Sequence, residues 1–419
     1  MIANISRGEI NGRIAAPPSK SFTHRAIVTA SLAEGTSTII NPLASDDTDA
    51  TTEVLRNLGV SIKREENAWK VFGGELKAPK NELFCMESGT TLRFTTAICS
   101  LVDGRCTITG AESLIRRPIG ELVNALRQLG AKCHSNGNFP PVITENSFIG
   151  GTANLRGDIS SQFISALLLV APLGSEDVKI NLNTELESLP YVMMTLHLQA
   201  LFGVKVNASK DMRRFEIERQ AYKPARYRVE GDWSSAAFLL AGGALSGKIE
   251  VTNLDLKSRQ ADRSIMEILG AMGAKIKVGK DSVIVEKSDL KAIDFNVSNC
   301  PDLFPVFSVL CSAASGKSRI TGIERLKIKE SDRVGEMEKG LTNMGIDFRR
   351  VGDAVEIKGS QAEGGIINSN DHRIAMSFGM LGTVAKGKTV IRNAQCVSKS
   401  FPEFWNYLAK LNANTEIVE

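Results

Sequence analysis

Hydrophobic and polar positions follow one composite pattern along this chain, and the pattern returns at an interval of about 70 residues. In each repeat a short polar motif precedes a predicted helix that is rich in Ala and Leu and apolar on most of its faces. A glycine and a β-branched strand follow, and a second, amphipathic helix then ends near Leu-Gly. Self-similarity at a fixed interval predicts a fold built from copies of one structural unit.

The repeats also predict how the chain divides. Six copies span residues 19–63, 87–133, 158–206, 231–278, 300–348 and 370–418. The second helices of the first five end at Gly59, Gly130, Gly203, Gly273 and Gly345, where we expect left-handed caps, and the last copy lacks this glycine. A chain of 419 residues exceeds what one core usually holds. We therefore predict an α/β fold with two similar domains of three units each, dividing near residues 227–232.

Composition narrows the possible functions. The net charge is only +4, from 51 basic and 47 acidic residues, and the basic residues are dispersed, which argues against a nucleic-acid groove. Seven cysteines form no C-x-x-C pair, so we expect reduced, buried thiols. The N-terminus has no signal-peptide pattern and no apolar run is long enough to span a membrane, so we expect a cytoplasmic protein.

Familiar cofactor and metal motifs are missing from the sequence. There is no H-E-x-x-H, no G-x-G-x-x-G after a strand and no G-x-S-x-G, and the four histidines and the cysteines have no metal-like spacing. We expect chemistry that uses no cofactor and no metal.

Cations occur where helix physics disfavours them. The N-terminus of a helix carries partial positive charge and ordinarily prefers acidic residues. Lys20 and Arg25 nevertheless follow Pro17-Pro18 at a predicted helix start, and Arg373 follows Asp371 at another. A bound anion would compensate these charges, although a solvated face is the competing interpretation. The serines and aspartates at the same positions are ordinary caps, a role we assign to Asp232 and Ser234.

The entrances of the second helices repeat the cationic theme. Arg116 and Arg117 precede Pro118, which we expect at a first helical position, and Lys399 lies in the matching loop of the last unit. Between them in the chain, the fifth unit gathers Lys327, Lys329, Glu330, Asp332 and Arg333. Convergent cations predict a small polyanionic ligand. Glu330 and Asp302 are candidates for general acid–base work, with plain salt bridges as the alternative.

The clusters, taken in order, resemble those of the enolpyruvyl transferases, and within that family its shikimate-phosphate members. The resemblance covers essentially the whole chain and rests on the strings PPSKSFTHR (17–25), SGTTLRF (88–94), RRPIGEL (116–122), SSQFISALL (160–168), KESDR (329–333), NDHRIAM (370–376) and KSFPEF (399–404). It implies two similar domains, each of three βαβαββ units around buried helices, with the active site in the interdomain cleft. It further implies that the first strand joins the C-terminal domain, giving domains 1–18 with 231–419 and 19–230.

The resemblance also implies a reaction. Such enzymes transfer the carboxyvinyl group of phosphoenolpyruvate to the 5-hydroxyl of shikimate 3-phosphate and release phosphate through an addition–elimination sequence. By motif position, phosphoenolpyruvate would be held by Lys20, Gly89, Arg117, Gln162, Arg333, Arg373 and Lys399. Shikimate 3-phosphate would be held by Ser21, Arg25, Ser160, Ser161, Ser188, Tyr191, Asp302 and Lys329. Asp302, Glu330 and Lys20 are the candidates for proton transfer. We expect a monomer with these small molecules as its partners.

Three positions depart from the common family pattern. Glu87 stands where many members of the family have Asn, in a string that commonly reads Gly-Asn-Ala-Gly or Gly-Asn-Ser-Gly. Phe94 replaces a common Pro, and Arg325 stands where Asn is frequent. These changes bear on the response to the inhibitor glyphosate and on substrate contacts near Arg325.

Two alternatives to this function remain open from the sequence. One is the sister transferase that acts on UDP-N-acetylglucosamine, which usually carries a reactive Cys where this chain has Glu112. The other is a non-catalytic protein of related fold that binds anions or RNA ends, which would not need Asp302 and Glu330.

Overall fold

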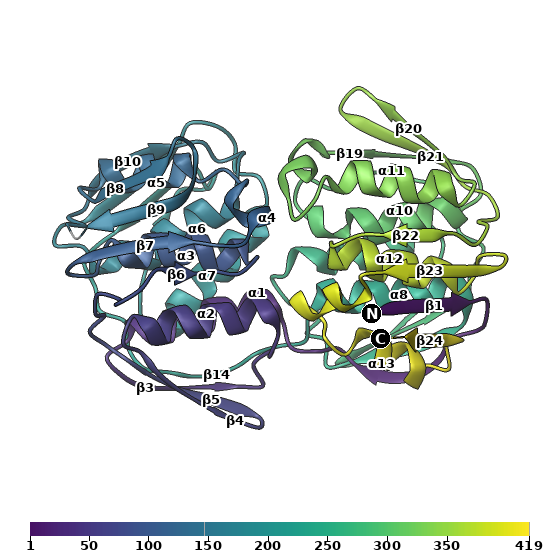
Figure 1. The fold of residues 1–419 in the computed structure, drawn as a ribbon, viewed down its shortest axis with the longest axis horizontal. Helices are drawn as coiled ribbons and strands as arrows, with labels where there is room; N and C mark the ends of the chain where they lie inside the picture. Colours follow the sequence, from purple (N-terminus) through teal and green to yellow (C-terminus); the bar gives the residue numbers. More distant parts are fainter. Residues whose placement is uncertain (146, 419) are drawn as a thin grey trace. The chain divides into compact units, whose positions relative to one another are not determined.

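The computed structural model describes residues 1–145 and 147–418 and divides into two compact units. The N unit comprises Pro18–Val229, and the C unit comprises Met1–Pro17 with Glu230–Glu419. Each unit is described by itself (Figure 1).

The N unit contains three four-stranded sheets within its described residues. Their strand orders are β14-β3-β5-β4, β6-β7-β9-β8 and β10-β11-β13-β12. The strands are β3 (Gly35–Ile40), β4 (Ser61–Glu65), β5 (Ala68–Gly73), β6 (Leu83–Phe84), β7 (Arg105–Thr109), β8 (Lys132–Asn136), β9 (Phe139–Glu145), β10 (Gly151–Leu155), β11 (Val178–Leu182), β12 (Asn207–Ala208), β13 (Arg214–Ile217) and β14 (Arg226–Arg228). The helices are α1 (Lys20–Leu32), α2 (Asp46–Asn57), α3 (Gly89–Cys99), α4 (Glu112–Ile115), α5 (Gly120–Gln128), α6 (Ser161–Val170) and α7 (Leu189–Leu201), with the 3₁₀ turn η1 (Ala171–Leu173).

The C unit repeats this plan over its own described residues. Its sheets have the orders β16-β17-β15-β2, β18-β19-β21-β20 and β22-β23-β1-β24. The strands are β1 (Ile2–Ser6), β2 (Asn11–Ala15), β15 (Lys248–Thr252), β16 (Lys275–Val278), β17 (Ser282–Glu286), β18 (Asp294–Asn296), β19 (Lys317–Thr321), β20 (Asp347–Val351), β21 (Ala354–Lys358), β22 (Ile366–Asn368), β23 (Lys388–Arg392) and β24 (Thr415–Val418). The helices are α8 (Trp233–Ser246), α9 (Ile265–Ala271), α10 (Phe304–Ala313), α11 (Arg333–Asn343), α12 (His372–Gly382) and α13 (Phe404–Lys410), with η2 (Ala261–Ser264), η3 (Pro301–Leu303), η4 (Glu324–Ile328) and η5 (Ala394–Lys399).

The first two strands of the chain lie in sheets of the C unit. β1 pairs antiparallel with β23 and β24, and β2 pairs parallel with β15. In the N unit, β14 pairs parallel with β3, so a strand from the end of this segment completes the sheet that its beginning started. Every sheet combines one parallel and two antiparallel pairings. In four of the sheets the parallel pair joins strands that are consecutive in the chain, and in the two sheets that contain β14 and β2 it joins strands from distant parts of the chain.

The helices that the sequence predicts to be apolar on most faces lie at the centres of the units, between the sheets (Figure 1). Every residue of α8 except Ser234 is buried, and nine of the ten residues of α6 are buried. Strands cover them with one face only: in β5, Trp69 and Val71 point inward while Phe72 is exposed. A fully buried side chain such as Phe163 contributes about 1.5–3 kcal/mol of hydrophobic stabilisation, so a helix that is buried on nearly all faces adds to the core along its whole length.

The five predicted helix-capping glycines all have positive φ. Gly59, Gly130, Gly203, Gly273 and Gly345 have φ between 81° and 91°. The last repeat, which lacks the glycine, places Asn412 at the same point with φ of 63°. Asn is the residue that tolerates the left-handed region best after Gly, so the cap is kept with a different residue.

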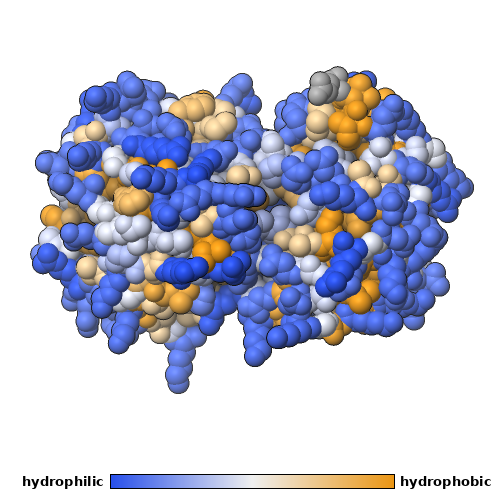
Figure 2. Space-filling view, turned by 90° about the horizontal axis from the view of Figure 1, so that it is seen from below, coloured by the Kyte–Doolittle hydropathy of each residue, from blue (hydrophilic) through white to orange (hydrophobic). Residues whose placement is uncertain are grey.

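The surface is predominantly polar in the view of Figure 2, and its apolar residues form small patches. Large exposed apolar side chains such as Phe84, Val278 and Ile366 lie on separate elements. Within the described residues, no helix is both long enough and apolar enough to cross a membrane.

Candidate active site

The start of α1 brings together the motif that opens the first repeat. Ser19 caps the helix by accepting a hydrogen bond from the Phe22 amide, so Lys20 occupies the first helical position, as predicted. The Lys20 ammonium lies 2.6 Å from Oδ2 of Asp47, at the N-terminus of α2, and the two side chains are only 15% and 13% exposed. The sequence predicts a negative charge beside Lys20 from a bound anion, and in this structure the Asp47 carboxylate supplies that charge.

Arg25 is held by neutral groups. Its guanidinium donates to Thr195 Oγ1 at 2.8 Å and to the carbonyl oxygens of Ser21 and Tyr191 at 3.0 and 3.1 Å. It also lies 5.5 Å from the centroid of the Phe94 ring. Burial lowers the pKa of Arg25 to about 10, which still leaves it protonated at neutral pH. α1 and α7 thus place a buried cation beside Ser21 and Tyr191.

The start of α3 is packed closely by two guanidinium groups. Ser88 caps the helix through the Thr91 amide. A Cβ at Gly89 would lie 2.8 Å from Nη1 of Arg117 and would clash with Nη1 of Arg93. Both arginines are 6% exposed. Glycine at position 89 is therefore what allows two cations to approach the N-terminus of this helix.

The starts of α6 and α7 complete the N-unit cluster. Ser160 caps α6 by accepting from the Gln162 amide, and Gln162 Nε2 donates to Thr90 Oγ1 of α3 at 3.0 Å. Ser161 is buried. Ser188 precedes α7 with a left-handed φ of 56°, three residues before Tyr191. Hydrogen bonds therefore link α3 to α6 through Thr90 and Gln162, and α1 to α7 through Arg25. The predicted residues of the N unit thus form two groups, one at each pair of helices.

One predicted helix start is wrong. α5 begins at Gly120 and not at Pro118. The amides of Ile119 and Gly120 donate to the carbonyl oxygen of Asn138 in the β8–β9 turn, so the segment after Arg117 is held by the hairpin before the helix begins.

In the C unit, a buried arginine is surrounded by carboxylates. Arg333, the first residue of α11, is 1% exposed. Its Nη1 donates to Asp302 at 2.7 Å, its Nη2 to Glu330 at 2.7 Å and its Nε to Asp371 at 2.8 Å. Asp371 also caps α12 through the Arg373 amide. The structure thus places two predicted carboxylates on the Arg333 guanidinium: Glu330, from the same KESDR motif, and Asp302, from a different part of the chain.

Asp302 is shared by two arginines. Its other oxygen accepts from Arg373 Nη2 at 2.8 Å. Burial alone would raise the pKa of Asp302, but Arg373, Arg333 and Lys329 outweigh it and hold the pKa well below its usual range. Asp302 is therefore ionised in this structure, and Arg373 already has an anionic partner.

Two predicted lysines border the same cluster. Burial lowers the pKa of Lys329 to about 8, although Asp302 and Glu330 act in the opposite direction. Lys399 donates from Nζ to the carbonyl oxygen of Asn370 at 2.9 Å, just before α12.

One of the two predicted caps of α8 is confirmed and the other is wrong. Asp232 accepts from the amide and hydroxyl of Ser235, as a cap does. Ser234 instead points its hydroxyl at the carboxylate of Asp262, in η2. Short polar motifs do not reveal which of two adjacent residues caps a helix when a distant side chain competes for one of them.

Several buried groups next to these residues were missed from the sequence: Asp47, Asp371 as a ligand of Arg333, Asp262, and Thr51. Thr51 lies 2.7 Å from Nδ1 of His24, whose pKa is lowered well below its ordinary value by burial and by the charges of Lys20 and Arg25. The only local signal was the run of acidic residues at the start of α2, which reads equally well as ordinary helix capping.

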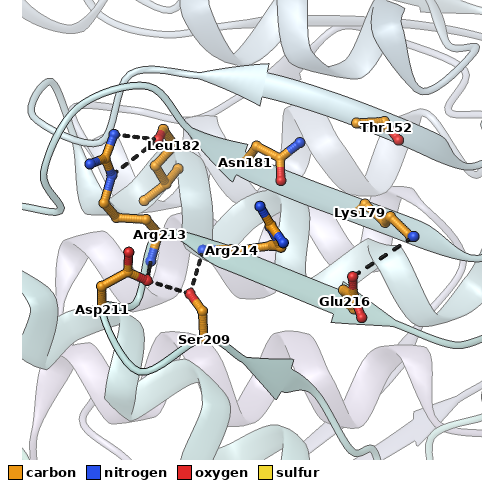
Figure 3. A pocket seen from close by; sticks show the side chains of 9 residues that line it. All are labelled: Thr152, Lys179, Asn181, Leu182, Ser209, Asp211, Arg213, Arg214 and Glu216. Atoms are coloured by element: carbon orange, nitrogen blue, oxygen red, sulfur yellow. Dashed lines mark hydrogen bonds and ion pairs between the residues drawn. The ribbon is translucent and has the colours of Figure 1, made fainter.

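A separate groove of about 580 Å³ lies on the sheet β10-β11-β13-β12 (Figure 3). Its charged groups already have partners: Lys179 pairs with Glu216, and Asp211 accepts a hydrogen bond from the Ser209 hydroxyl. The Arg213 guanidinium donates hydrogen bonds to the carbonyl oxygen of Leu182. None of the residues predicted for the site lines this groove.

Comparison with known proteins identifies the family. The family model of EPSP synthase (3-phosphoshikimate 1-carboxyvinyltransferase) matches residues 5–408. The chain belongs to the EPSP synthase family. Among curated relatives, the 3-phosphoshikimate 1-carboxyvinyltransferase of Dehalococcoides mccartyi strain BAV1 is 43% identical over 96% of both chains. The enzyme of that name from Methanocaldococcus jannaschii is 40% identical over 97% of both chains. An EPSP synthase structure from Acinetobacter baumannii superposes with a TM-score of 0.84 and 27% identity, covering both chains completely.

The structure shows what the residues that depart from the common EPSP synthase pattern contact. Glu87 accepts a hydrogen bond from Ser113 of α4 at 2.7 Å. Phe94 is fully buried and lies against the Arg25 guanidinium. Arg325 donates to the carbonyl oxygen of Ser298 at 2.6 Å. Glu112, at the position where the sister transferase usually has Cys, is exposed and pairs with Arg116.

Proposed function

We propose that this chain transfers the carboxyvinyl group of phosphoenolpyruvate to the 5-hydroxyl of shikimate 3-phosphate, a step of aromatic amino acid biosynthesis. The whole-length match to 3-phosphoshikimate 1-carboxyvinyltransferases carries the proposal. The two cationic clusters support it, because both substrates are polyanions and helix N-termini with arginine forks suit phosphate and carboxylate groups.

The substrate-binding roles are part of this proposal. Phosphoenolpyruvate binds to Lys20, Gly89, Arg117, Gln162, Arg333, Arg373 and Lys399. Shikimate 3-phosphate binds to Ser21, Arg25, Ser160, Ser161, Ser188, Tyr191, Asp302 and Lys329. The burial of Arg25 and the tight packing at Gly89 support these assignments, because both hold cations in fixed positions before a ligand arrives.

Proton transfer is assigned to Asp302, Glu330 and Lys20. The 5-hydroxyl oxygen forms a bond to C2 of phosphoenolpyruvate and loses its proton, while C3 gains a proton and becomes a methyl group. In the second step the C2–phosphate oxygen bond breaks, and C3 returns a proton as the double bond re-forms. Asp302 is the base for the hydroxyl. When Arg373 turns to a substrate anion, Asp302 loses one cationic partner and becomes more basic.

Phosphate release tests the proposal. The purified protein is mixed with phosphoenolpyruvate in the presence or absence of shikimate 3-phosphate, with no metal or cofactor added. We expect release that requires both substrates. An Asp302→Asn protein purified in parallel reports any contaminating phosphatase. Release with UDP-N-acetylglucosamine in place of shikimate 3-phosphate, or no release with either acceptor, would contradict the proposed reaction.

A further inference from the structure

A buried carboxyl group lies beside the C-unit cluster and has no role in the proposed mechanism. Asp262, in η2, is 1% exposed. Its Oδ2 accepts a hydrogen bond from the hydroxyl of Ser234, in α8. Its Oδ1 is buried and, among the residues that the structure describes, has no hydrogen-bond partner. An ionised carboxylate with one oxygen left unpaired in the interior is costly, and a protonated carboxyl group costs much less.

The charges around Asp262 come from several elements. α8 contributes the Asp232 carboxylate from its N-cap, η3 contributes Asp302, and α12 contributes Arg373. The Cys300 thiol, just before η3, is also close enough to feel the charge of Asp262. Arg263, next to Asp262 in the chain, directs its guanidinium to the carbonyl oxygen of Leu256 instead. Two acidic groups therefore face Asp262 against one cation.

Arg373, the one cation that faces Asp262, forms its ion pair with Asp302 and not with Asp262. Asp302 is bonded to both Arg333 and Arg373, whereas Asp262 is bonded to a serine hydroxyl. Two neighbouring carboxyl groups with one shared cation do not both ionise readily. Burial and the Asp302 charge raise the pKa of Asp262 to about 7, in spite of Arg373 and the Ser234 hydrogen bond. In this pair of acids the proton is therefore held by Asp262 and not by Asp302.

We propose that Asp262 is a positioning residue that must carry a proton for Arg373 to hold a substrate anion. Ionised Asp262 would place a second negative charge beside Arg373, would compete for the guanidinium and would repel an incoming phosphate or carboxylate. Protonated Asp262 leaves Asp302 as the one carboxylate to be displaced. This inference rests on the proposed function, because it takes Arg373 as a binding group for phosphoenolpyruvate.

Calorimetric titration with phosphoenolpyruvate alone, between pH 7 and pH 9, tests the inference without turnover. The phosphate group of the ligand is almost fully ionised over this range, so its own charge stays nearly constant. We expect the Kd of the natural protein to rise about tenfold per pH unit above pH 7, because one proton must be retained. Asp262→Asn keeps the size of the side chain without its charge. Its Kd should rise much less than that of the natural protein over the same pH range.

Two further variants sharpen the result. Ser234→Ala removes the hydrogen bond that favours the ionised form, so the pH at which Kd begins to rise should move upward. Glu230→Gln is the matched control: Glu230 is a partly buried acid with a raised pKa and a serine partner, Ser258, but it faces Asp255 and Asp232 instead of an arginine assigned to phosphoenolpyruvate. It should keep the natural pH profile.

The outcomes separate the two proposals. Superimposable Kd profiles for the natural protein and folded Asp262→Asn would overturn the role of Asp262, even if phosphate release confirms the enzyme. The expected difference in profiles without any turnover would support Asp262 and contradict the proposed reaction. If Asp262→Asn does not fold, the direction of the Ser234→Ala shift decides: an unchanged or lower onset overturns the inference.

Discussion

The two clusters of predicted site residues neutralise their cations in different ways. In the N unit, Arg25 is bonded to a hydroxyl and two carbonyl oxygens, and Arg117 packs against the backbone at Gly89. In the C unit, Arg333 is bonded to three carboxylates and Arg373 shares one of them. In the N unit, Lys20 is paired with Asp47 but Arg25 has neutral hydrogen-bond partners, whereas both arginines of the C-unit cluster are bonded to carboxylates.

This difference indicates a division of labour. Cations with neutral partners are ready to bind an anion, because no protein anion has to be displaced first. Cations paired with carboxylates bind a substrate at the expense of an existing ion pair, but the carboxylates they release are the groups that can move protons. We therefore expect Arg25 to contribute mainly affinity and Asp302 mainly turnover.

The largest expected effect is a difference in the free energy of unfolding between variants of the two buried arginines, Arg333 and Arg25. Arg333→Leu leaves three carboxylates around an apolar side chain, so the free energy of unfolding should fall by about 3–5 kcal/mol. Arg25→Leu removes hydrogen bonds to neutral acceptors and should cost less, about 1–3 kcal/mol. Urea unfolding at neutral pH measures both. An equal or larger loss for Arg25→Leu would contradict the comparison.

The next effect concerns the packing at α3. Gly89→Ala pushes the guanidinium groups of Arg93 and Arg117 away from the helix start, which should raise the KM for phosphoenolpyruvate about tenfold, the equivalent of ~1.4 kcal/mol. Initial-rate kinetics measure it.

Gly270→Ala in α9 is the control for this substitution. A Cβ there meets nothing within 4 Å, so this change should leave KM unaltered and stabilise the helix by about 0.5–1 kcal/mol. Equal KM values for Gly89→Ala and the natural protein would show that the two arginines are not held by this contact.

The smallest expected effect is the pH response of Lys329. Its pKa of about 8 means that the positive charge is lost as the pH rises through 8, so the KM for shikimate 3-phosphate should increase several-fold between pH 8 and pH 9. Over the same pH range, the loss of this proton weakens substrate binding but increases the free energy of unfolding. The unfolded chain keeps this proton up to the ordinary pKa of 10.5, so the Lys329 contribution to stability rises between those two values.

Lys329→Arg is the variant that checks this assignment. Arginine stays protonated throughout this range, so the rise in KM above pH 8 should disappear. A rise that persists in Lys329→Arg would assign it to another group.

The repeating fold could be predicted from the sequence because its signals are local. Apolar periodicity locates a buried helix, and a glycine after a helix signals a left-handed cap. Even so, the cap at Asn412 escaped the pattern, because Asn can serve in place of Gly. The start of α5 was wrong because the Asn138 carbonyl oxygen, from a later hairpin, takes the amides that would have begun the helix.

The candidate site was predictable only in part, for a different reason. The cations lie in short motifs, but their partners come from residues far away in the chain. Asp47 is 27 residues from Lys20, and Asp371 is 38 residues from Arg333. Asp262 had no motif at all: its character comes from burial and from charges on three other elements, which no local pattern encodes.

The division between affinity and turnover is tested most directly by comparing Arg25→Met with Asp302→Asn in steady-state kinetics, after both have been shown to fold. We predict that Arg25→Met raises the KM for shikimate 3-phosphate about 10- to 100-fold with little change in kcat. Asp302→Asn should lower kcat by roughly 10²–10⁴ with a much smaller change in that KM. Loss of kcat in Arg25→Met, or a KM effect alone in Asp302→Asn, would contradict the account.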